Sequence, residues 1–251
     1  MTHPDPIPAA TVVVMREQAD GPPELLMLER SKAMVFAGGA WVFPGGRIDA
    51  GDRALAAALG LDDEDGPARI AAIRESIEEA GVAPGVVPAP DAVTIARLRA
   101  ALHGGATIGA VLEAEDLALD PDALVPFARW LPLGMSHRIF DTRFYLALHP
   151  ADAPEPSVDA TENTRLAWTT ARGALVAADA GRAEVIFPTR CNLERLALFA
   201  DHAQAVAYAR RYGIRAITPW IEARDGIDYV CIPDDLGYPV TALPARFARR
   251  A

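Results

Sequence analysis

The segment R-I-A-A-I-R-E-S-I-E-E-A-G-V, residues Arg69–Val82, decides how this chain is interpreted. Pro67 and Gly81 bound a stretch that has the pattern of a helix, Pro67–Ala80. Because successive helical residues turn by about 100°, one side of this helix carries three carboxylates within roughly 100° of arc: Glu75, Glu78 and Glu79. The opposite side is apolar: Ile70, Ile73 and Ile77. The pattern predicts a helix that packs on a core and presents a concentrated negative charge.

A negative cluster of this kind has two interpretations. Like charges at helical spacing repel one another and destabilise an isolated helix, so the face is either solvated or neutralised. Arg74, four residues before Glu78, offsets part of the repulsion. A divalent cation would offset more, and oxygen-rich clusters suit hard ions such as Mg²⁺ and Mn²⁺. Considered without the rest of the chain, this helix is more typical of a solvated acidic surface than of a metal site.

The upstream segment A-W-V-F-P-G-G-R-I-D-A-G-D, residues Ala40–Asp52, changes this balance. Glycine has no Cβ, so the Pro-Gly-Gly turn lets the backbone come close to another group. By itself such a turn is common. Followed by R-E-x-x-E-E-x-G on a helix, it forms a specific combination.

Together the two segments resemble a Nudix box. The family pattern is Gly, five residues, Glu, seven residues, and then Arg-Glu-apolar-x-Glu-Glu-x-Gly-apolar. Gly46 matches the first glycine, and Asp52 stands where the first Glu is expected. The second half is matched by six residues: Arg74, Glu75, Glu78, Glu79, Gly81 and Val82.

The chain departs from this pattern in its spacer, which has 21 residues, Arg53–Ile73, where the pattern has seven. A surface connection accepts such an insertion at modest entropic cost. Ser76 also replaces an apolar residue. The spacer and the flanking segments resemble the peroxisomal coenzyme A diphosphatases and their bacterial relatives; the flanks are L-M-L-E-R-S (Leu26–Ser31), L-V-P-F-A-R-W (Leu124–Trp130), F-D-T-R-F-Y (Phe140–Tyr145) and F-P-T-R (Phe187–Arg190). That branch usually has Arg where this chain has Val35.

The resemblance implies an α/β/α sandwich with a mixed sheet, and a water that attacks a phosphorus of a nucleoside diphosphate derivative. It implies that Mg²⁺ or Mn²⁺ is held by Glu75, Glu78 and Glu79, with the Gly46 carbonyl as a further ligand, and that Arg74 holds the carboxylates in place. A metal ion neutralises the diphosphate, lowers the pKa of a bound water and orients its attack. A carboxylate can then accept the proton of the water.

Further residues are candidates for the same chemistry. Glu162, just before a predicted strand, is an extra metal ligand or the base, or equally a solvated loop acid. Arg129, Arg138 and Arg143 have guanidinium groups that suit phosphate oxygens, although each taken singly is more typical of a structural ion pair. Trp130 and Phe144 are more typical of a core than of a base-stacking surface.

The rest of the chain predicts a Nudix domain over residues 9–212 and a packed C-terminal extension over residues 213–251. Thr11–Arg16 and Glu24–Arg30 predict a β-hairpin. Leu61–Gly66, which carries four acids, predicts a solvated loop. Residues 84–121 predict a helical insertion with helices at Asp91–Leu102 and Ile108–Glu115, and further strands are expected at Leu124–Leu131, Thr142–Leu148 and Arg165–Thr169.

Composition excludes several classes of protein. Hydrophobic residues make up 51% and charged residues 23% of the 251 residues, which allows a sizeable core. The net charge of −10 argues against long nucleic acids as partners, and we expect no membrane association. The two cysteines, Cys191 and Cys231, are expected to be reduced thiols of a cytoplasmic protein. The sequence leaves the oligomeric state open, a homodimer included.

Three functions therefore compete. The first is a metal-dependent diphosphatase of coenzyme A or acyl-coenzyme A. The second is a pyrophosphatase of NADH or ADP-ribose. The third is a Nudix-like sensor that binds a nucleotide and cuts nothing, which the retained Glu75, Glu78 and Glu79 disfavour.

Overall fold

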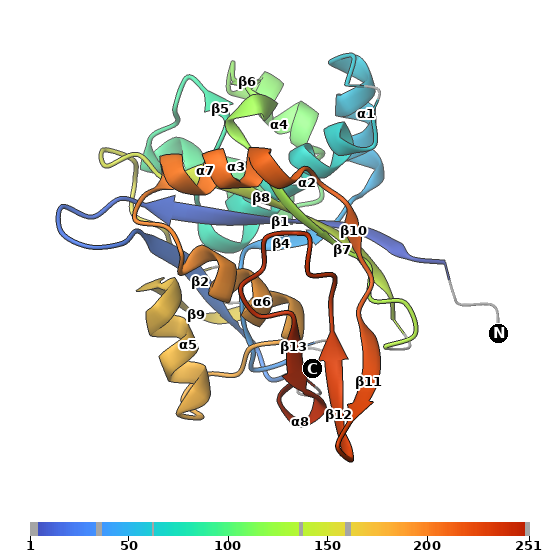
Figure 1. Ribbon diagram of the computed structural model, residues 1–251. Coiled ribbons are helices and arrows are strands. Elements are labelled where there is room, and N and C mark those ends of the chain that lie inside the picture. Colours follow the sequence, from blue (N-terminus) through green and yellow to red (C-terminus); the bar gives the residue numbers. More distant parts are fainter. Residues whose placement is uncertain (1–4, 34–36, 62, 136–137, 159–161, 249–251) are drawn as a thin grey trace.

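A computed structural model describes residues 5–33, 37–61, 63–135, 138–158 and 162–248 (Figure 1). Its centre is an eight-stranded mixed sheet with the strand order β10-β7-β8-β1-β2-β3, to which β4 is added beside β1 and β9 beside β2. The strands are β1 (Ile7–Arg16), β2 (Glu24–Arg30), β3 (Trp41–Val42), β4 (Gly45–Arg47), β7 (Val125–Trp130), β8 (Phe140–Leu148), β9 (Asn163–Thr170) and β10 (Ala216–Ile217).

The long strand β1 organises this sheet because it is paired with three others. It is parallel to β8 over nine residue pairs and antiparallel to β2 and β4. Alternate side chains of a strand point to opposite faces. Val13 and Met15 accordingly join one core cluster, whereas Val12 and Val14 join the other. One strand therefore anchors both layers of the sandwich.

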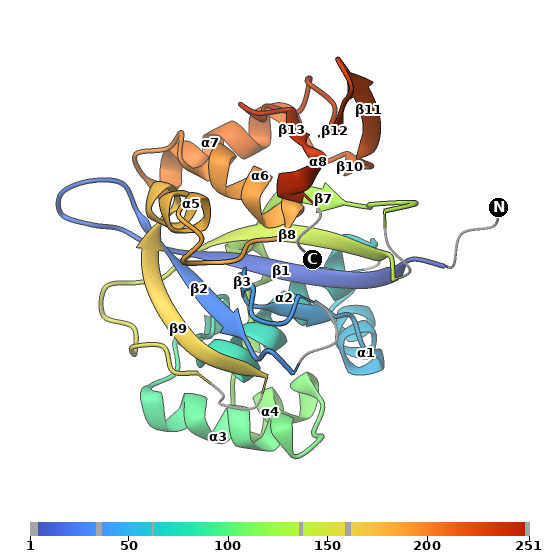
Figure 2. The same cartoon turned by 90° about the horizontal axis from the view of Figure 1, so that it is seen from below.

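Helices cover both faces of the sheet (Figure 2). One face carries α1 (Ala50–Ala58), α2 (Asp65–Ala80), α3 (Ala92–His103) and α4 (Ile108–Ala114). The other carries α5 (Ala171–Asp179), α6 (Phe187–Leu196) and α7 (His202–Tyr212). None of the helices in the described ranges is long and apolar enough to span a bilayer. The α/β/α sandwich predicted from the sequence is confirmed.

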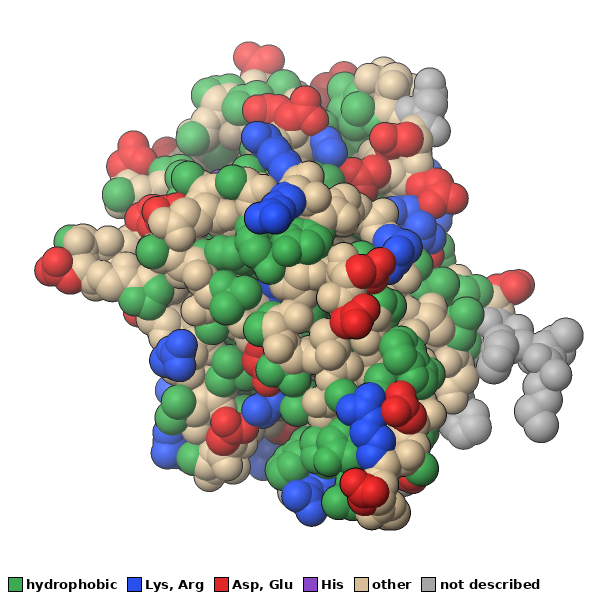
Figure 3. Space-filling model, viewed as in Figure 1, with side chains coloured by type: hydrophobic (Ala, Val, Ile, Leu, Met, Phe, Trp, Pro, Cys, Tyr) green, Lys and Arg blue, Asp and Glu red, His purple; other side chains and the backbone are tan. Residues whose placement is uncertain are grey.

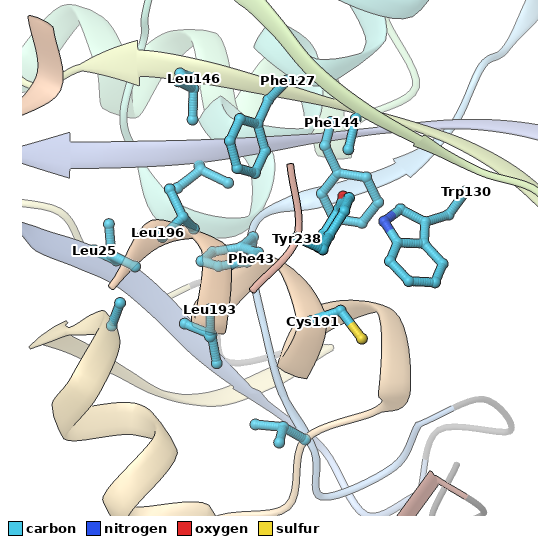
Figure 4. Packing of buried hydrophobic residues seen from close by; sticks show 14 of the residues in the cluster. Leu25, Phe43, Phe127, Trp130, Phe144, Leu146, Cys191, Leu193, Leu196 and Tyr238 are labelled. Carbon is cyan, nitrogen blue, oxygen red and sulfur yellow. The ribbon is translucent and has the colours of Figure 1, made fainter. Parts of the chain in front are cut away.

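The C-terminal residues pack on the second of these layers. They form a three-stranded sheet, β11 (Trp220–Arg224), β12 (Ile227–Cys231) and β13 (Ala242–Pro244), followed by α8 (Ala245–Ala248). Val230 and Tyr238 are buried in the same cluster as Phe127 and Trp130 of β7, as Figure 4 shows for three of these residues. Both cysteines are buried and unbonded to each other. On the face seen in Figure 3, described basic and acidic side chains are interspersed.

The local predictions compare well with these elements. The β1–β2 hairpin and the strands β7, β8 and β9 lie where the sequence patterns indicated, whereas both glycines of the expected Pro-Gly-Gly turn lie in the short strand β4. The region of residues 84–121 contains the two expected helices. It also contains two short strands that no periodicity revealed, β5 (Val86–Val87) and β6 (Ala118–Leu119), and the 3₁₀ turn η1 (Pro121–Ala123) begins at its last residue.

The prediction of a solvated loop over Leu61–Gly66 was wrong at its C-terminal end, and Asp62 lies outside the described residues. Helix α2 already begins at Asp65, two residues before Pro67. The Asp65 carboxylate accepts a 2.6 Å hydrogen bond from the hydroxyl of Tyr145, and Arg69 donates to it at 2.8 Å. Gly66 is buried against Leu61. Tertiary partners on β8 therefore extend the helix into the acidic run.

The Tyr145 hydroxyl links β8 to the first turn of α2, and removing it should destabilise the protein. Tyr145 is fully buried, so Tyr145→Phe leaves the Asp65 carboxylate without one donor inside a packed layer. We expect a loss of about 1–2 kcal/mol in the free energy of unfolding, measured by urea denaturation. Tyr229→Phe on β12, at a half-buried residue, is the control and should change stability by less. Equal stability of Tyr145→Phe and the wild type would contradict the link.

Candidate active site

The segment Pro44-Gly45-Gly46, whose two glycines lie in β4, brings backbone groups against the carboxylates of α2. Strand β4 pairs with β1 so that Gly45 lies opposite Thr11 and Gly46 opposite Ala10. From this position the Gly45 N–H donates a 2.9 Å hydrogen bond to Glu79 Oε2. Pairing with β1 therefore fixes β4 in place, and the Gly45 N–H of β4 fixes the Glu79 carboxylate of α2.

Gly46 is required here for close approach and not for its backbone conformation. Its φ is not positive, so another residue could adopt it. A Cβ at Gly46 would nevertheless lie 2.3 Å from Oε1 and 2.4 Å from Cδ of Glu75. The Glu75 carboxylate therefore occupies the space that any side chain at this position would need.

The guanidinium of Arg74 is the hub of the acidic groups. It donates to both oxygens of Asp52, at 2.9 Å each. It also donates at 2.8 Å to Glu75 Oε1, to Glu78 Oε2 and to the Arg47 carbonyl. This side chain is only 9% exposed. One buried cation therefore orients two of the three helix carboxylates and ties them to β4.

Asp52 replaces the first Glu of the pattern and is fully buried in α1. Besides accepting from Arg74, it accepts the N–H of Asp49, and the Asp49 carboxylate accepts the N–H of Asp52. This reciprocal pair is a capping box that starts α1. Asp52 therefore takes part in the N-terminal cap of α1 and also binds the Arg74 guanidinium.

Glu79 is held by groups from three other elements. In addition to Gly45, Asn163 at the start of β9 donates to Glu79 Oε1 at 3.2 Å. Arg30 at the end of β2 places Nη1 at 3.9 Å from Glu79 and Nη2 at 3.6 Å from Glu162. The side chains of Glu79 and Arg30 are 6% and 15% exposed, whereas that of Glu162 is 55% exposed.

Burial changes the protonation of the helix carboxylates. Burial raises the pKa of Glu75 to about 8, against the opposing charge of Arg74 and with support from the neighbouring Glu79 and Glu78. Burial likewise raises the pKa of Glu79 to about 7, although the Gly45 N–H and Asn163 favour its ionised form. The pKa of Glu78 is also raised by burial, against the pull of Arg74. Near neutral pH, Glu75 and Glu79 therefore still bind protons, and added positive charge beside them would favour their ionised forms.

A cavity of about 660 Å³ opens beside this cluster. The charged residues that line it are Arg30, Arg47, Asp49, Arg74, Glu75, Arg138 and Glu162. Most of its other lining residues are apolar, among them Val42, Phe43, Trp130, Pro132, Phe140, Phe144, Ile186 and Pro188. Figure 4 shows Phe43, Phe144 and Trp130 close together in the core. The cavity can therefore receive a ligand that has both anionic and apolar parts.

No protein-family model and no curated protein matches this chain. Among solved structures, a NUDIX hydrolase from Alicyclobacillus acidocaldarius is 30% identical, with a TM-score of 0.70, over 81% of this chain and 96% of that one. The chain belongs to the Nudix hydrolase family.

More distant structures are also similar to this Nudix hydrolase. A MutT protein from Methanosarcina mazei Go1 is 15% identical, with a TM-score of 0.45, over 78% of this chain and 95% of that one. The NUDIX domain of Shewanella oneidensis NrtR, complexed with ADP ribose, is 14% identical, with a TM-score of 0.42, over 83% and 88%. The similarity to the Alicyclobacillus acidocaldarius hydrolase confirms the predicted enzyme class, a Nudix-type pyrophosphohydrolase.

The candidate residues of this Nudix hydrolase do not all meet at the cavity. Gly46, Arg74, Glu75, Arg138 and Glu162 line it. Glu78 and Glu79 are not among its lining side chains, but Arg74 and Gly45 connect them to it.

Arg129 and Arg143 lie outside the cavity lining. They are opposite each other on β7 and β8. Arg129 binds Asp141 at 2.8 and 2.6 Å, and Arg143 binds Glu64 at 2.6 Å. Both arginines therefore form the structural ion pairs that were the alternative to substrate binding. A role of either arginine in binding substrate stays a prediction.

Three residues near the site were missed by the sequence analysis: Arg30, Arg47 and Asn163. Arg30 ends the β2 strand and Asn163 begins β9, and these strands are antiparallel neighbours that pair the two residues. The sequence offered two signals for these residues. Arg30 ends a predicted strand, and Asn163 directly follows the candidate acid Glu162. The pairing of β2 with β9 joins distant parts of the sequence, so neither residue could be assigned to Glu79 beforehand.

Nudix hydrolases generally use divalent metal ions, and the donor types of this site fit such a group. All the acidic side chains offer oxygen, which Mg²⁺ and Mn²⁺ prefer, and burial of so many carboxylates is costly without a counter-charge. Within the described ranges, no three His, Cys, Asp or Glu side chains already form a metal-binding group. The reason is visible in the contacts, since Glu75 and Glu78 face Arg74 while Glu79 faces Gly45.

Gly46→Ala should displace the Glu75 carboxylate without unfolding the protein, because the three atoms nearest to the new Cβ all belong to the Glu75 side chain. We expect hydrolysis of any diphosphate substrate to fall at least about tenfold, which is about 1.4 kcal/mol of barrier.

The matched control is Gly109→Ala on α4, where a Cβ would lie 3.6 Å from Leu55, an ordinary contact. Equal turnover of the two variants would show that Glu75 can move aside freely.

The raised pKa values predict a pH-dependent stability of the metal-free protein. The folded state binds protons on Glu75 and Glu79 up to pH values of about 8 and 7, whereas unfolded Glu releases its proton near pH 4.5. Between these values the folded state binds more protons, so stability falls as pH rises. We expect the Tm in chelator to decrease from pH 5 to pH 8, with a smaller decrease in Glu79→Gln. An identical pH dependence in both proteins would contradict this origin.

Proposed function

We propose that this protein hydrolyses the diphosphate linkage of a nucleoside diphosphate derivative, of the coenzyme A or acyl-coenzyme A type, with Mg²⁺ or Mn²⁺. The observation that carries the proposal is the contact between the Pro-Gly-Gly turn and α2. Gly45 donates to Glu79, and Gly46 leaves room for Glu75. These contacts concentrate carboxylates at the edge of a cavity that arginines also line.

In this proposal Glu75, Glu78 and Glu79 hold the metal by their carboxylates, with the Gly46 carbonyl as a further ligand. The ion would supply charge neutralisation of the diphosphate and a more acidic bound water. Glu75 and Glu78 would exchange part of their contact with Arg74 for the ion. Glu79 keeps its two amide donors, from Gly45 and Asn163, which fix one carboxylate in place.

Arg74 acts in this proposal as a positioning residue. Its bonds to Asp52 and to the Arg47 carbonyl hold the guanidinium when Glu75 and Glu78 turn away. Asp52 is fully buried, so it keeps this contact out of water. The guanidinium therefore stays beside the carboxylates throughout and limits their repulsion.

The proton of the attacking water has two possible acceptors, Glu75 and Glu162. Glu75 is buried beside the turn, with a pKa of about 8 in the absence of metal. Glu162 lines the cavity from the start of β9 and lies 3.6 Å from Arg30, which would hold its carboxylate toward the ligand. A pH–rate profile of Glu162→Gln separates them, because loss of the base removes the acidic limb of the profile.

The substrate class rests on the resemblance and on the cavity. The helix α1 stands inside the interrupted box, which resembles the coenzyme A branch. The cavity wall combines arginines with a largely apolar surface, which suits a substrate with a diphosphate and a long uncharged arm. Arg138 lies on this wall and is the candidate for a phosphate contact. NADH and ADP-ribose are the competing substrates.

The proposal is tested with a panel of coenzyme A, acyl-coenzyme A, NADH, ADP-ribose and dinucleoside polyphosphates, with products identified by mass. We expect cleavage at the diphosphate with Mg²⁺ or Mn²⁺, loss in chelator, and recovery when the ion is returned. Coenzyme A should have the highest kcat/KM. Full activity in excess chelator would contradict the mechanism, and tight binding without cleavage would favour the sensor.

Glu79→Gln should reduce turnover by orders of magnitude, because it removes a charged ligand while the apolar side of α2 stays packed. One of its two amide donors, Gly45 or Asn163, would lose an oxygen acceptor, so the Tm is measured in parallel. Glu113→Gln on the exposed face of α4 is the matched control. A folded Glu79→Gln protein with the turnover of Glu113→Gln would remove Glu79 from the chemistry.

A further inference from the structure

We propose that the N-terminus of α6, together with the Thr189 hydroxyl, binds a phosphate group of the substrate other than the diphosphate that is cut. This inference rests on the proposed diphosphatase function and narrows its substrate class. The substrate would be a nucleoside diphosphate derivative that carries an additional phosphate monoester.

The first observation is the uncapped start of α6. The N-cap residue is Ile186, which has no side-chain acceptor for the first N–H groups of the helix. Among the described residues, no hydrogen-bond acceptor is found for the N–H of Phe187 or of Thr189. Pro188, between them, has no N–H. The helix start therefore presents two unused donors and the positive end of its dipole, which favours an anion.

The second observation is the Thr189 side chain. Thr189 is only 3% exposed, and its hydroxyl has no hydrogen-bond partner within the part of the chain that the structure describes. It nevertheless lines the 660 Å³ cavity, together with Ile186 and Pro188. Its place on the cavity lining lets a ligand supply a hydrogen bond to this hydroxyl, and a bond of that kind is stronger when the ligand group is charged.

The position of α6 separates this site from the carboxylate cluster. Helix α2 covers one face of the sheet and α6 covers the other (Figure 2). Their residues belong to the two different core clusters, and the cavity is the place where both layers contribute to one wall. Because the two helices approach the cavity from different layers, the inference assigns the phosphate at α6 to a different group from the diphosphate beside Glu75.

Helix α6 is held firmly enough to serve as a fixed site. Asn192, one turn after Thr189, accepts hydrogen bonds from the Trp130 indole at 3.3 Å and from the Tyr238 hydroxyl at 2.8 Å. Arg195 donates to the Phe127 carbonyl at 2.9 Å. Strand β7 and the C-terminal segment thus fix the helix from two sides, so its N-terminus does not need to be ordered by the ligand.

The test is calorimetric binding of two nucleotides in chelator: adenosine 3′,5′-bisphosphate, which carries a second phosphate, and 5′-AMP, which does not. We expect the wild type to bind the bisphosphate at least about tenfold more tightly than 5′-AMP. Thr189→Val removes only the hydroxyl and should reduce this ratio by about tenfold, in line with a hydrogen bond to a charged group. Thr189→Ser should restore it.

Thr142→Val on β8 is the matched control, because it makes the same change on another wall of the cavity and should leave the ratio unchanged. Equal affinities of the wild type for the two nucleotides, no binding of either, or an unchanged ratio in a folded Thr189→Val protein would overturn the inference. The outcome is independent of hydrolysis. Cleavage of the substrate panel can fail while the binding preference persists, and cleavage can succeed while the preference is absent.

Discussion

The structure of the site depends on one buried guanidinium. Arg74 faces Asp52, Glu75 and Glu78 within hydrogen-bond distance and also donates to the Arg47 carbonyl. Carboxylates placed this close together inside a protein repel one another and lose their hydration. A single planar cation with several donors reduces both costs and fixes the direction of each acid. Its contacts also join α1, α2 and β4, so the same group that limits the repulsion assembles the site.

This arrangement explains how the interrupted box remains one unit. The insertion between Asp52 and Arg74 is long, yet Asp52, the last residue of the first half of the box, and Arg74, the first residue of the second half, are bonded to each other. Asp52 at the start of α1 is fixed by its capping box, and α2 is fixed by its apolar side. The intervening chain can vary in length because neither end of it depends on its path.

The cavity is a product of both helical layers. Strands β1 and β8 contribute lining residues, α2 supplies charged groups from one layer, and the first turn of α6 contributes residues from the other. The carboxylates carry pKa values raised by burial, whereas the first turn of α6 has N–H groups without an acceptor among the described residues. A ligand that reaches both helices must suit both kinds of group, which constrains the substrate more than either helix alone.

The sequence by itself determined the elements whose signals are local. The helix with three acids on one side, the β1–β2 hairpin and the strands β7 to β9 follow from periodicity and turn chemistry, and the resemblance of the motif residues to a Nudix box suggested the family. The tertiary structure decided which distant groups complete the site. Arg30 and Asn163 meet Glu79 only because β2 pairs with β9, Arg129 and Arg143 are taken by Asp141 and Glu64, and α2 begins early because Tyr145 binds Asp65. These contacts join residues far apart in the chain, and their free energy depends on burial and pairing that exist only after the sheet has formed.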